Sequence, residues 1–109
     1  MMPVETPPNL RVLTATPEAA PQYDISDPAF LDILSDSQRR HFWFQARNRR
    51  ILDLLAREGV RPPARVLEVG CGAGVVLVAL ADAGFEAVGI EMHATLACSA
   101  ARACPRSRV

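Results

Sequence analysis

The sequence predicts an α/β fold with a doubly wound parallel sheet. Three observations support this prediction. Helix-like and strand-like segments alternate, a glycine-rich turn follows the first strand-like segment, and 50% of the 109 residues are hydrophobic. When helices alternate with strands along a chain, the strands are parallel and are joined by right-handed crossovers. The chain is long enough for one small domain.

Prolines are concentrated at the N-terminal end, where six of the nine lie within the first 28 residues. Residues 1–26 cannot bury enough apolar surface to offset the entropy of ordering, so we expect a proline-rich flexible tail. The segment SDPAFLDIL, at residues 26–34, predicts a short helix. Ser26 or Asp27 is expected as its N-cap, with Pro28 in the first turn.

A long helix is predicted over residues 36–59, with Gly59 as its C-terminal end. Basic and aromatic residues mix between positions 39 and 50, a pattern that nucleic-acid-binding segments share. The apolar residues favour a different interpretation, an amphipathic helix that lies across a sheet. Its apolar face consists of four residues that recur at the helical period: Phe44, Ile51, Leu54 and Leu55.

Two short segments rich in branched aliphatic residues, 64–70 and 85–91, predict strands that are buried on both faces. A helix is predicted over residues 73–83, before Gly84, and another over residues 94–103.

Two parallel strands do not complete a doubly wound sheet. Residues 27–109 are therefore interpreted as the N-terminal part of a domain, truncated before its third strand. We expect this part to leave a sheet edge and an apolar sheet face uncovered, which permits self-association.

The turn after the first predicted strand contains Gly70, Gly72 and Gly74 in the pattern G-x-G-x-G. A dinucleotide-binding turn has its third glycine at the position that Val75 occupies. Glu68 ends the preceding strand and is expected to point toward the ligand. A carboxylate about 5 Å from a phosphate group is repelled by roughly 3 kcal/mol at an effective dielectric of about 20, whereas a cationic ligand is favoured there.

The pattern E-x-G-x-G-x-G, residues 68–74, resembles the first motif of the class I S-adenosylmethionine-dependent methyltransferases. The segment AVGIEMH resembles their second motif, and HFWFQARNRRILDLL is similar to a segment that precedes the first motif in one group of bacterial methyltransferases. The resemblance covers residues 38–104. It implies a Rossmann-like fold, S-adenosylmethionine as cofactor, and methyl transfer to an unidentified small-molecule acceptor. For a fragment that acts alone, cofactor binding without turnover is an open alternative.

The resemblance also implies roles for residues of this chain. Gly70 and Gly72 would let the backbone approach the methionine part of the cofactor, because a Cβ atom there would occupy the ligand's space. Glu68 would face the methionine ammonium group, and Glu91 would accept hydrogen bonds from the ribose hydroxyls. The remaining residues expected in the cofactor site are Cys71, Gly74 and Met92, the last along the adenine.

Trp43 and Arg47 lie at the edge of the apolar helix face, from which either side chain reaches toward the cofactor or packs on the protein. Cys71 is interpreted as a small loop residue and not as a nucleophile. The residues that select the acceptor normally follow the fourth strand in this family, so no catalytic residue is assigned. His41 and His93 are expected at the surface.

Two other functions stay open. One is an interaction module that pairs through its exposed sheet edge. The other is an NAD-binding fragment of an oxidoreductase, because Glu91 follows the glycine loop by about 20 residues, as in NAD-binding folds.

The 12 acidic and 12 basic residues give no global attraction to nucleic acid or to an anionic membrane. The three cysteines have no metal-ligand spacing. We therefore expect no metal site and a reduced, cytoplasmic setting.

Overall fold

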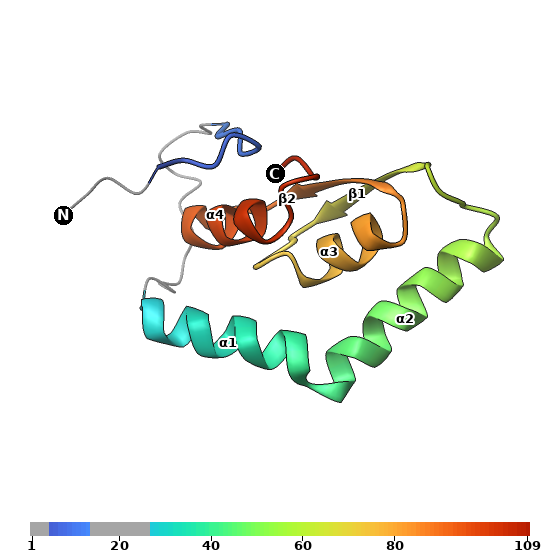
Figure 1. Ribbon diagram of the computed structural model, residues 1–109, viewed down its shortest axis with the longest axis horizontal. Helices are drawn as coiled ribbons and strands as arrows, with labels where there is room; N and C mark the ends of the chain where they lie inside the picture. Colours follow the sequence, from blue (N-terminus) through green and yellow to red (C-terminus); the bar gives the residue numbers. More distant parts are fainter. Residues whose placement is uncertain (1–4, 14–26) are drawn as a thin grey trace.

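The computed structural model describes residues 5–13 and 27–109. Two helices come first and are followed by alternating strands and helices (Figure 1). The elements are α1 (Pro28–Arg40), α2 (Phe42–Arg57), β1 (Arg65–Val69), α3 (Val75–Asp82), β2 (Glu86–Ile90) and α4 (Ala94–Ala103). Among the described helices, none has the length and apolar character needed to cross a bilayer.

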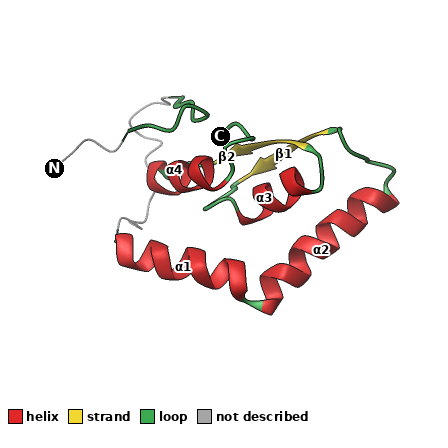
Figure 2. Cartoon of the chain, in the orientation of Figure 1, coloured by secondary structure: helices red, strands yellow, loops and turns green. Residues whose placement is uncertain are grey.

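The two strands pair in parallel, with Arg65 opposite Glu86 and Val69 opposite Ile90 (Figure 2). On its other edge, β2 is joined to the last residues of the chain. Val88 and Arg108 form an isolated parallel bridge, in which the Gly89 N–H donates to the Arg108 carbonyl at 2.9 Å. The predicted α/β order with parallel strands is therefore confirmed.

One face of the sheet is covered by helices. Figure 1 shows α3 and α4 on the same side of the sheet, with α1 and α2 forming a V beyond them. The largest core cluster lies on this side and is centred on Leu77, Leu80 and Phe85. Ile51, Leu52 and Leu55 of α2 pack against this cluster. The core therefore lies between the helices and the face of the sheet that they cover.

The opposite face of the sheet is exposed. Leu67 and Val69 of β1 are 57% and 76% exposed, and Val88 and Ile90 of β2 are exposed beside them. The expectation that both strands are buried on both faces is therefore wrong. Successive side chains of a strand point to opposite faces, and in the described residues only one face of this sheet carries helices.

The predicted long helix over residues 36–59 is interrupted at His41, which the sequence analysis missed. This residue has extended backbone angles, φ −70° and ψ 130°, and it ends α1 and caps α2. Its N–H donates to the Ser37 carbonyl at 2.8 Å, and its Nδ1 accepts from the Trp43 N–H at 3.3 Å. One residue therefore satisfies a backbone group at the end of α1 and another at the start of α2, and the chain turns here without a glycine or a proline.

The helix ends agree with the sequence in other respects. Asp27 is the N-cap of α1 and accepts from the Ala29 N–H at 3.0 Å, whereas the alternative cap, Ser26, lies outside the described residues. The helix continues to Arg40, beyond the predicted short segment. Gly59 follows α2 with φ +74° and Gly84 follows α3 with φ +95°, as expected of glycines that end helices.

The buried face of α2 differs by one residue from the prediction. Leu54 is 43% exposed, whereas its neighbour Leu52 packs on the core. Phe44, Ile51 and Leu55 are half-buried, as expected of the apolar face. The wrong assignment arose because positions 51, 54 and 55 satisfy the helical period as well as positions 51, 52 and 55 do.

Residues 5–13, within the predicted proline-rich tail, make contacts that the sequence did not indicate. The Asn9 Nδ2 atom donates to the carbonyls of Ala101, Cys104 and Ser107 at 2.9, 3.1 and 2.8 Å. The Arg11 N–H donates to the Val109 carbonyl, and the Val109 N–H donates to the Asn9 carbonyl. This segment therefore closes the C-terminal end of α4; the rest of the predicted tail lies outside the described residues.

Candidate functional site

The glycine loop between β1 and α3 is tied to the end of β2. The N–H groups of Gly70 and Cys71 both donate to the Ile90 carbonyl, at 2.7 and 3.0 Å. The Gly72 N–H donates to Oε2 of Glu91 at 2.8 Å. The two segments that the sequence analysis assigned to one cofactor site are therefore adjacent at the carboxyl ends of the strands, where parallel sheets bind ligands.

The three loop glycines all have left-handed backbone angles, but their surroundings differ. A Cβ atom on Gly70 (φ +76°) or on Gly72 (φ +55°) would meet nothing within 4 Å. A Cβ atom on Gly74 (φ +90°) would lie 3.0 Å from Cα of Ala100. Gly74 therefore allows α3 and α4 to approach each other, whereas the space beside Gly70 and Gly72 is open.

The carboxylate of Glu91 is held by two backbone N–H groups. Its Oε1 accepts from the His93 N–H at 3.0 Å, while Oε2 accepts from Gly72. Each carboxylate oxygen has two lone pairs, so each retains one acceptor position beyond these bonds. The carboxylate is therefore fixed in orientation and still able to accept hydrogen bonds.

Glu68 lies opposite Gly89 in the sheet and is half-buried. Its Oε2 atom is buried and has no hydrogen-bond partner. Burial raises the pKa of Glu68 to about 7, and the positive charge of Arg47 opposes this rise. A carboxylate that is desolvated and only partly compensated is an unfavourable arrangement unless a further positive group joins it.

Arg47 brings that positive charge from α2. Its guanidinium lies 5.8 Å from the centre of the Trp43 ring and 5.0 Å from that of the Phe44 ring. The two rings meet edge to face, with their centres 5.4 Å apart. The Nε atom of Arg47 is buried and has no hydrogen-bond partner. The aromatic rings thus position a cation that retains unused hydrogen-bonding capacity.

Cys71 occupies the loop without the properties of a nucleophile. Its side chain is buried against Gly89, where an added Cβ would lie 2.7 Å from the Cys71 sulfur. Burial, together with the charges of Glu68 and Glu91, raises the pKa of Cys71 to about 11. A thiol at this pKa is protonated at neutral pH, so the interpretation of Cys71 as a small loop residue fits its surroundings.

Met92 and the histidines complete the surroundings of the loop. Met92 follows β2 and is 63% exposed, so its side chain is accessible beside Glu91. His41 is exposed, as expected, but the expectation for His93 is wrong because its side chain is 8% exposed. His93 is the N-cap residue of α4 and has extended backbone angles, φ −85° and ψ 113°.

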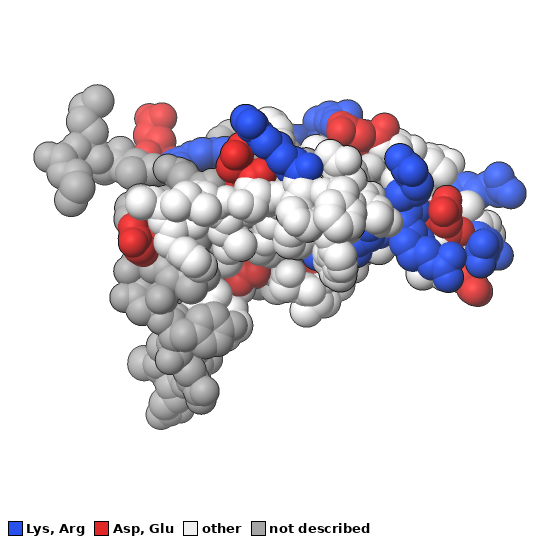
Figure 3. Space-filling model, turned by 90° about the horizontal axis from the view of Figure 1, so that it is seen from below, with Lys and Arg blue, Asp and Glu red and all other residues white. Residues whose placement is uncertain are grey.

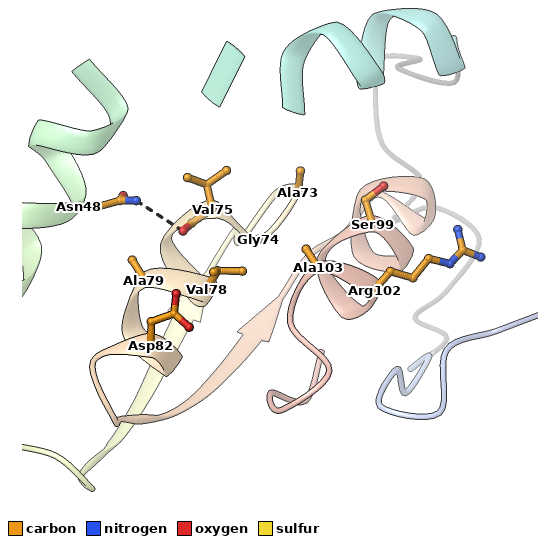
Figure 4. A pocket seen from close by; sticks show the side chains of 10 residues that line it. All are labelled: Asn48, Ala73, Gly74, Val75, Val78, Ala79, Asp82, Ser99, Arg102 and Ala103. Atoms are coloured by element: carbon orange, nitrogen blue, oxygen red, sulfur yellow. Dashed lines mark hydrogen bonds between the residues drawn. The ribbon is translucent and has the colours of Figure 1, made fainter. Parts of the chain in front are cut away.

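A pocket of about 790 Å³ opens beside the loop, between α3, α4 and α2 (Figure 4). Asn48 enters it from α2, where its Nδ2 donates to the Val75 carbonyl at 3.4 Å. Glu68 and Glu91 do not line this pocket. Asn48 was not identified from the sequence, although an amide among the apolar residues Phe44, Ile51 and Leu55 is a recognisable departure from an apolar helix face. The lining residues are Asn48, Ala73, Gly74, Val75, Val78, Ala79, Asp82, Ser99, Arg102 and Ala103.

The surface charge is uneven. In Figure 3, basic side chains gather at the end of the molecule that carries the C-terminal half of α2, with acidic side chains among them. Arg49, Arg50 and Arg57 are exposed on this helix, as is Asp53. Among residues 5–13 and 27–109, no three histidine, cysteine or acidic side chains are grouped so that they could hold a metal ion.

Comparison with known proteins assigns most of the chain to one family. Residues 35–104 match a family described as a methyltransferase domain. The match includes α2, both strands, the glycine loop and α4, and it agrees closely with the range expected from the sequence motifs. No curated protein and no solved structure matches the chain.

Proposed function

Because the chain belongs to the methyltransferase domain family, we propose that it binds S-adenosylmethionine at the glycine loop and transfers the methyl group to a small-molecule acceptor. The observation that carries this proposal is the proximity of Glu68 and Arg47, two opposite charges that are close enough to interact but form no ion pair. These side chains have opposite charges, and each has a buried polar atom without a partner beside the open space at Gly70 and Gly72.

The two charges suit the amino-acid end of S-adenosylmethionine. No ion pair connects Glu68 to Arg47 in the described part of the chain, although Arg47 lies close enough to oppose the rise in the Glu68 pKa. An ammonium group would compensate Glu68, and a carboxylate would compensate the guanidinium of Arg47. Hydrogen bonds to charged groups contribute about 1.5–3 kcal/mol each, so satisfying both groups provides substantial affinity.

Glu91 and Met92 suit the adenosine end. The Glu91 carboxylate is oriented by Gly72 and His93, and its remaining lone pairs are acceptors for two ribose hydroxyls. The exposed thioether of Met92 offers a polarizable surface for adenine. A diphosphate would instead meet the carboxylates of Glu68 and Glu91, which disfavours the NAD-binding alternative.

When bound, S-adenosylmethionine supplies a methyl group on a positively charged sulfur. Glu68, Arg47 and Glu91 act on the two ends of such a ligand, so they restrict its orientation in the site. Restricting orientation lowers the barrier to transfer, because the acceptor meets a methyl group that already points toward it. The proposal places the protein in the cytoplasm, where cysteines such as Cys71, Cys98 and Cys104, which form no disulfide, remain reduced.

Calorimetric titration tests the proposed ligand. S-adenosylmethionine is expected to bind with one molecule per chain, and NAD is expected to give no heat of binding under the same conditions. The double variant Arg47→Gln, Glu68→Gln is expected to lose most of the affinity, whereas Glu58→Gln, an exposed change at the end of α2, is expected to preserve it. Binding of NAD in preference to S-adenosylmethionine would overturn the proposal.

A further inference from the structure

Three ionisable side chains lie near the loop end of β1, and a cation from α2 acts on one of them. Glu68 is the last but one residue of β1, Cys71 lies in the loop, and Glu91 follows β2. The three groups occupy one small region, because the Cys71 sulfur lies against Gly89, which is opposite Glu68 in the sheet, and the next residue, Gly72, donates to Glu91. Both carboxylates raise the pKa of the Cys71 thiol. Arg47 from α2 is the cation that opposes the rise in the Glu68 pKa.

The two carboxylates are compensated very differently. Glu91 accepts hydrogen bonds from two backbone N–H groups, at 2.8 and 3.0 Å, and these donors stabilise its negative charge. Oε2 of Glu68 is buried and has no hydrogen-bond donor, and Glu68 forms no ion pair with Arg47. A buried carboxylate without donors favours its protonated form. At mildly acid pH, the Glu68 carboxyl group therefore holds a proton when no ligand is bound.

We infer that Glu68 makes cofactor binding proton-linked: the ammonium group of the ligand displaces the proton of this buried carboxylic acid, which is released to solvent. The inference rests on the proposed function, and it adds a regulatory property to the same site. At mildly acid pH the ammonium group must compete with the proton, so the affinity falls as the pH falls.

The size of the effect follows from the pKa of about 7 for Glu68 without ligand. If the bound ammonium group lowers this pKa well below 6, the ionised fraction before binding sets the apparent affinity. The affinity for S-adenosylmethionine is then expected to fall about eightfold between pH 7.5 and pH 6. At pH 6, binding is expected to release about 0.9 protons per ligand into the buffer.

Calorimetry of the full chain in buffers with different ionisation enthalpies measures both quantities. An α-amino group titrates with a pKa of about 7.7–8.0, so the ligand contributes a pH dependence of its own. Glu68→Gln provides the reference, because it retains the shape of the side chain and cannot release a proton. Arg47→Gln is a second test: removing the opposing charge raises the pKa of Glu68 further, so the loss of affinity is expected to begin at higher pH.

The outcomes separate the inference from the proposed function. Proton release at pH 6 by the wild type, together with a nearly flat profile for Glu68→Gln, supports the inference. Parallel profiles for the wild type and Glu68→Gln, or binding without proton release at pH 6, overturn the inference and leave the proposed function intact. Absence of binding by the wild type at every pH overturns the proposed function itself. If Glu68→Gln does not bind S-adenosylmethionine, the inference is tested by the wild type alone: proton release at pH 6 supports it, and binding without proton release overturns it.

Discussion

The Gly72 N–H donates to the Glu91 carboxylate at 2.8 Å, which joins the glycine loop to the end of β2 across 19 positions of sequence. The residue proposed to bind the ribose therefore also fixes the loop that approaches the methionine part of the ligand. Because Glu91 has both roles, we expect a substitution there to weaken binding more than a substitution at any other single position of the site.

Replacing Glu91 with alanine is expected to weaken S-adenosylmethionine binding by at least about a hundredfold, because two hydrogen bonds to a charged acceptor are lost. The unfolding free energy without ligand is expected to fall by about 1–3 kcal/mol, because the Gly72 and His93 amides lose their acceptor. Calorimetry and urea unfolding measure these two effects. The matched change Glu58→Ala is expected to alter neither, and unchanged binding by Glu91→Ala would contradict the assigned role.

Replacing Gly70 with alanine distinguishes the effect of an added methyl group on cofactor binding from its effect on backbone strain. Gly70 and Gly59 have nearly equal angles, φ +76° and +74°, and a Cβ on either would meet nothing within 4 Å. Gly70→Ala and Gly59→Ala are therefore both expected to cost about 1–2 kcal/mol of stability in thermal unfolding. Only Gly70→Ala is expected to reduce S-adenosylmethionine affinity, by about tenfold or more, because its methyl group occupies the ligand's space. Equal affinities in the two variants would place the ligand elsewhere.

Replacing Asn9 with alanine tests the contacts of the N-terminal segment. The change removes a side chain that donates to three backbone carbonyls near the end of α4. We expect the unfolding free energy to fall by about 1–3 kcal/mol, because these carbonyls lose a donor in a half-buried position. Val12→Ala, an exposed change in the same segment, is the control. A melting temperature equal to that of the wild type would show that the segment contributes nothing to stability.

The stability of the protein without ligand is expected to depend on Glu68. The pKa of Glu68 is raised from 4.5 to about 7, so the folded state binds its proton more tightly than the unfolded state does. The resulting stabilisation is complete below about pH 4.5 and is lost as the pH rises through about 7. Glu68→Gln is therefore expected to be more stable than the wild type at pH 8, by about 1–2 kcal/mol, since partial hydration reduces the effect. Denaturant unfolding at pH 5 and pH 8 checks whether the difference grows with pH.

The exposed sheet face predicts concentration-dependent association. Leu67, Val69 and Ile90 present adjacent apolar side chains on this face. Sedimentation velocity is expected to show a larger mean mass as the protein concentration rises, and Leu67→Lys is expected to reduce this increase. Val12→Lys, outside the sheet, serves as the control. A wild-type protein that stays monomeric over the whole concentration range would refute the expectation.

The parts of the fold that depend on local sequence could be predicted. The strands, the glycine turn, the caps at Asp27 and Gly59, and the second acidic position at Glu91 each have a short-range pattern. The strand order follows from these because parallel connections obey general topological rules. The break at His41 could not be predicted in the same way, because neither a glycine nor a proline marks it.

The missed features of the site depend on contacts between distant segments. Asn9 reaches carbonyls more than 90 positions away, and no local pattern encodes such a pairing. The burial of His93 follows from the turn into α4, and the exposure of Leu54 from the rotation of α2 against the core. The lack of hydrogen-bond partners at Oε2 of Glu68 and Nε of Arg47 could be recognised only in the structure, although both residues could be identified as candidates from the sequence.

The bond between Arg11 and Val109 has a consequence for biosynthesis. Arg11, in the segment of residues 9–11, is synthesised 98 positions before its partner Val109. At about 5–20 residues per second, this segment waits roughly 5–20 s before its partner exists. Until Val109 has been made, residues 9–11 are therefore available to chaperones and proteases, and their attachment cannot precede the synthesis of Val109.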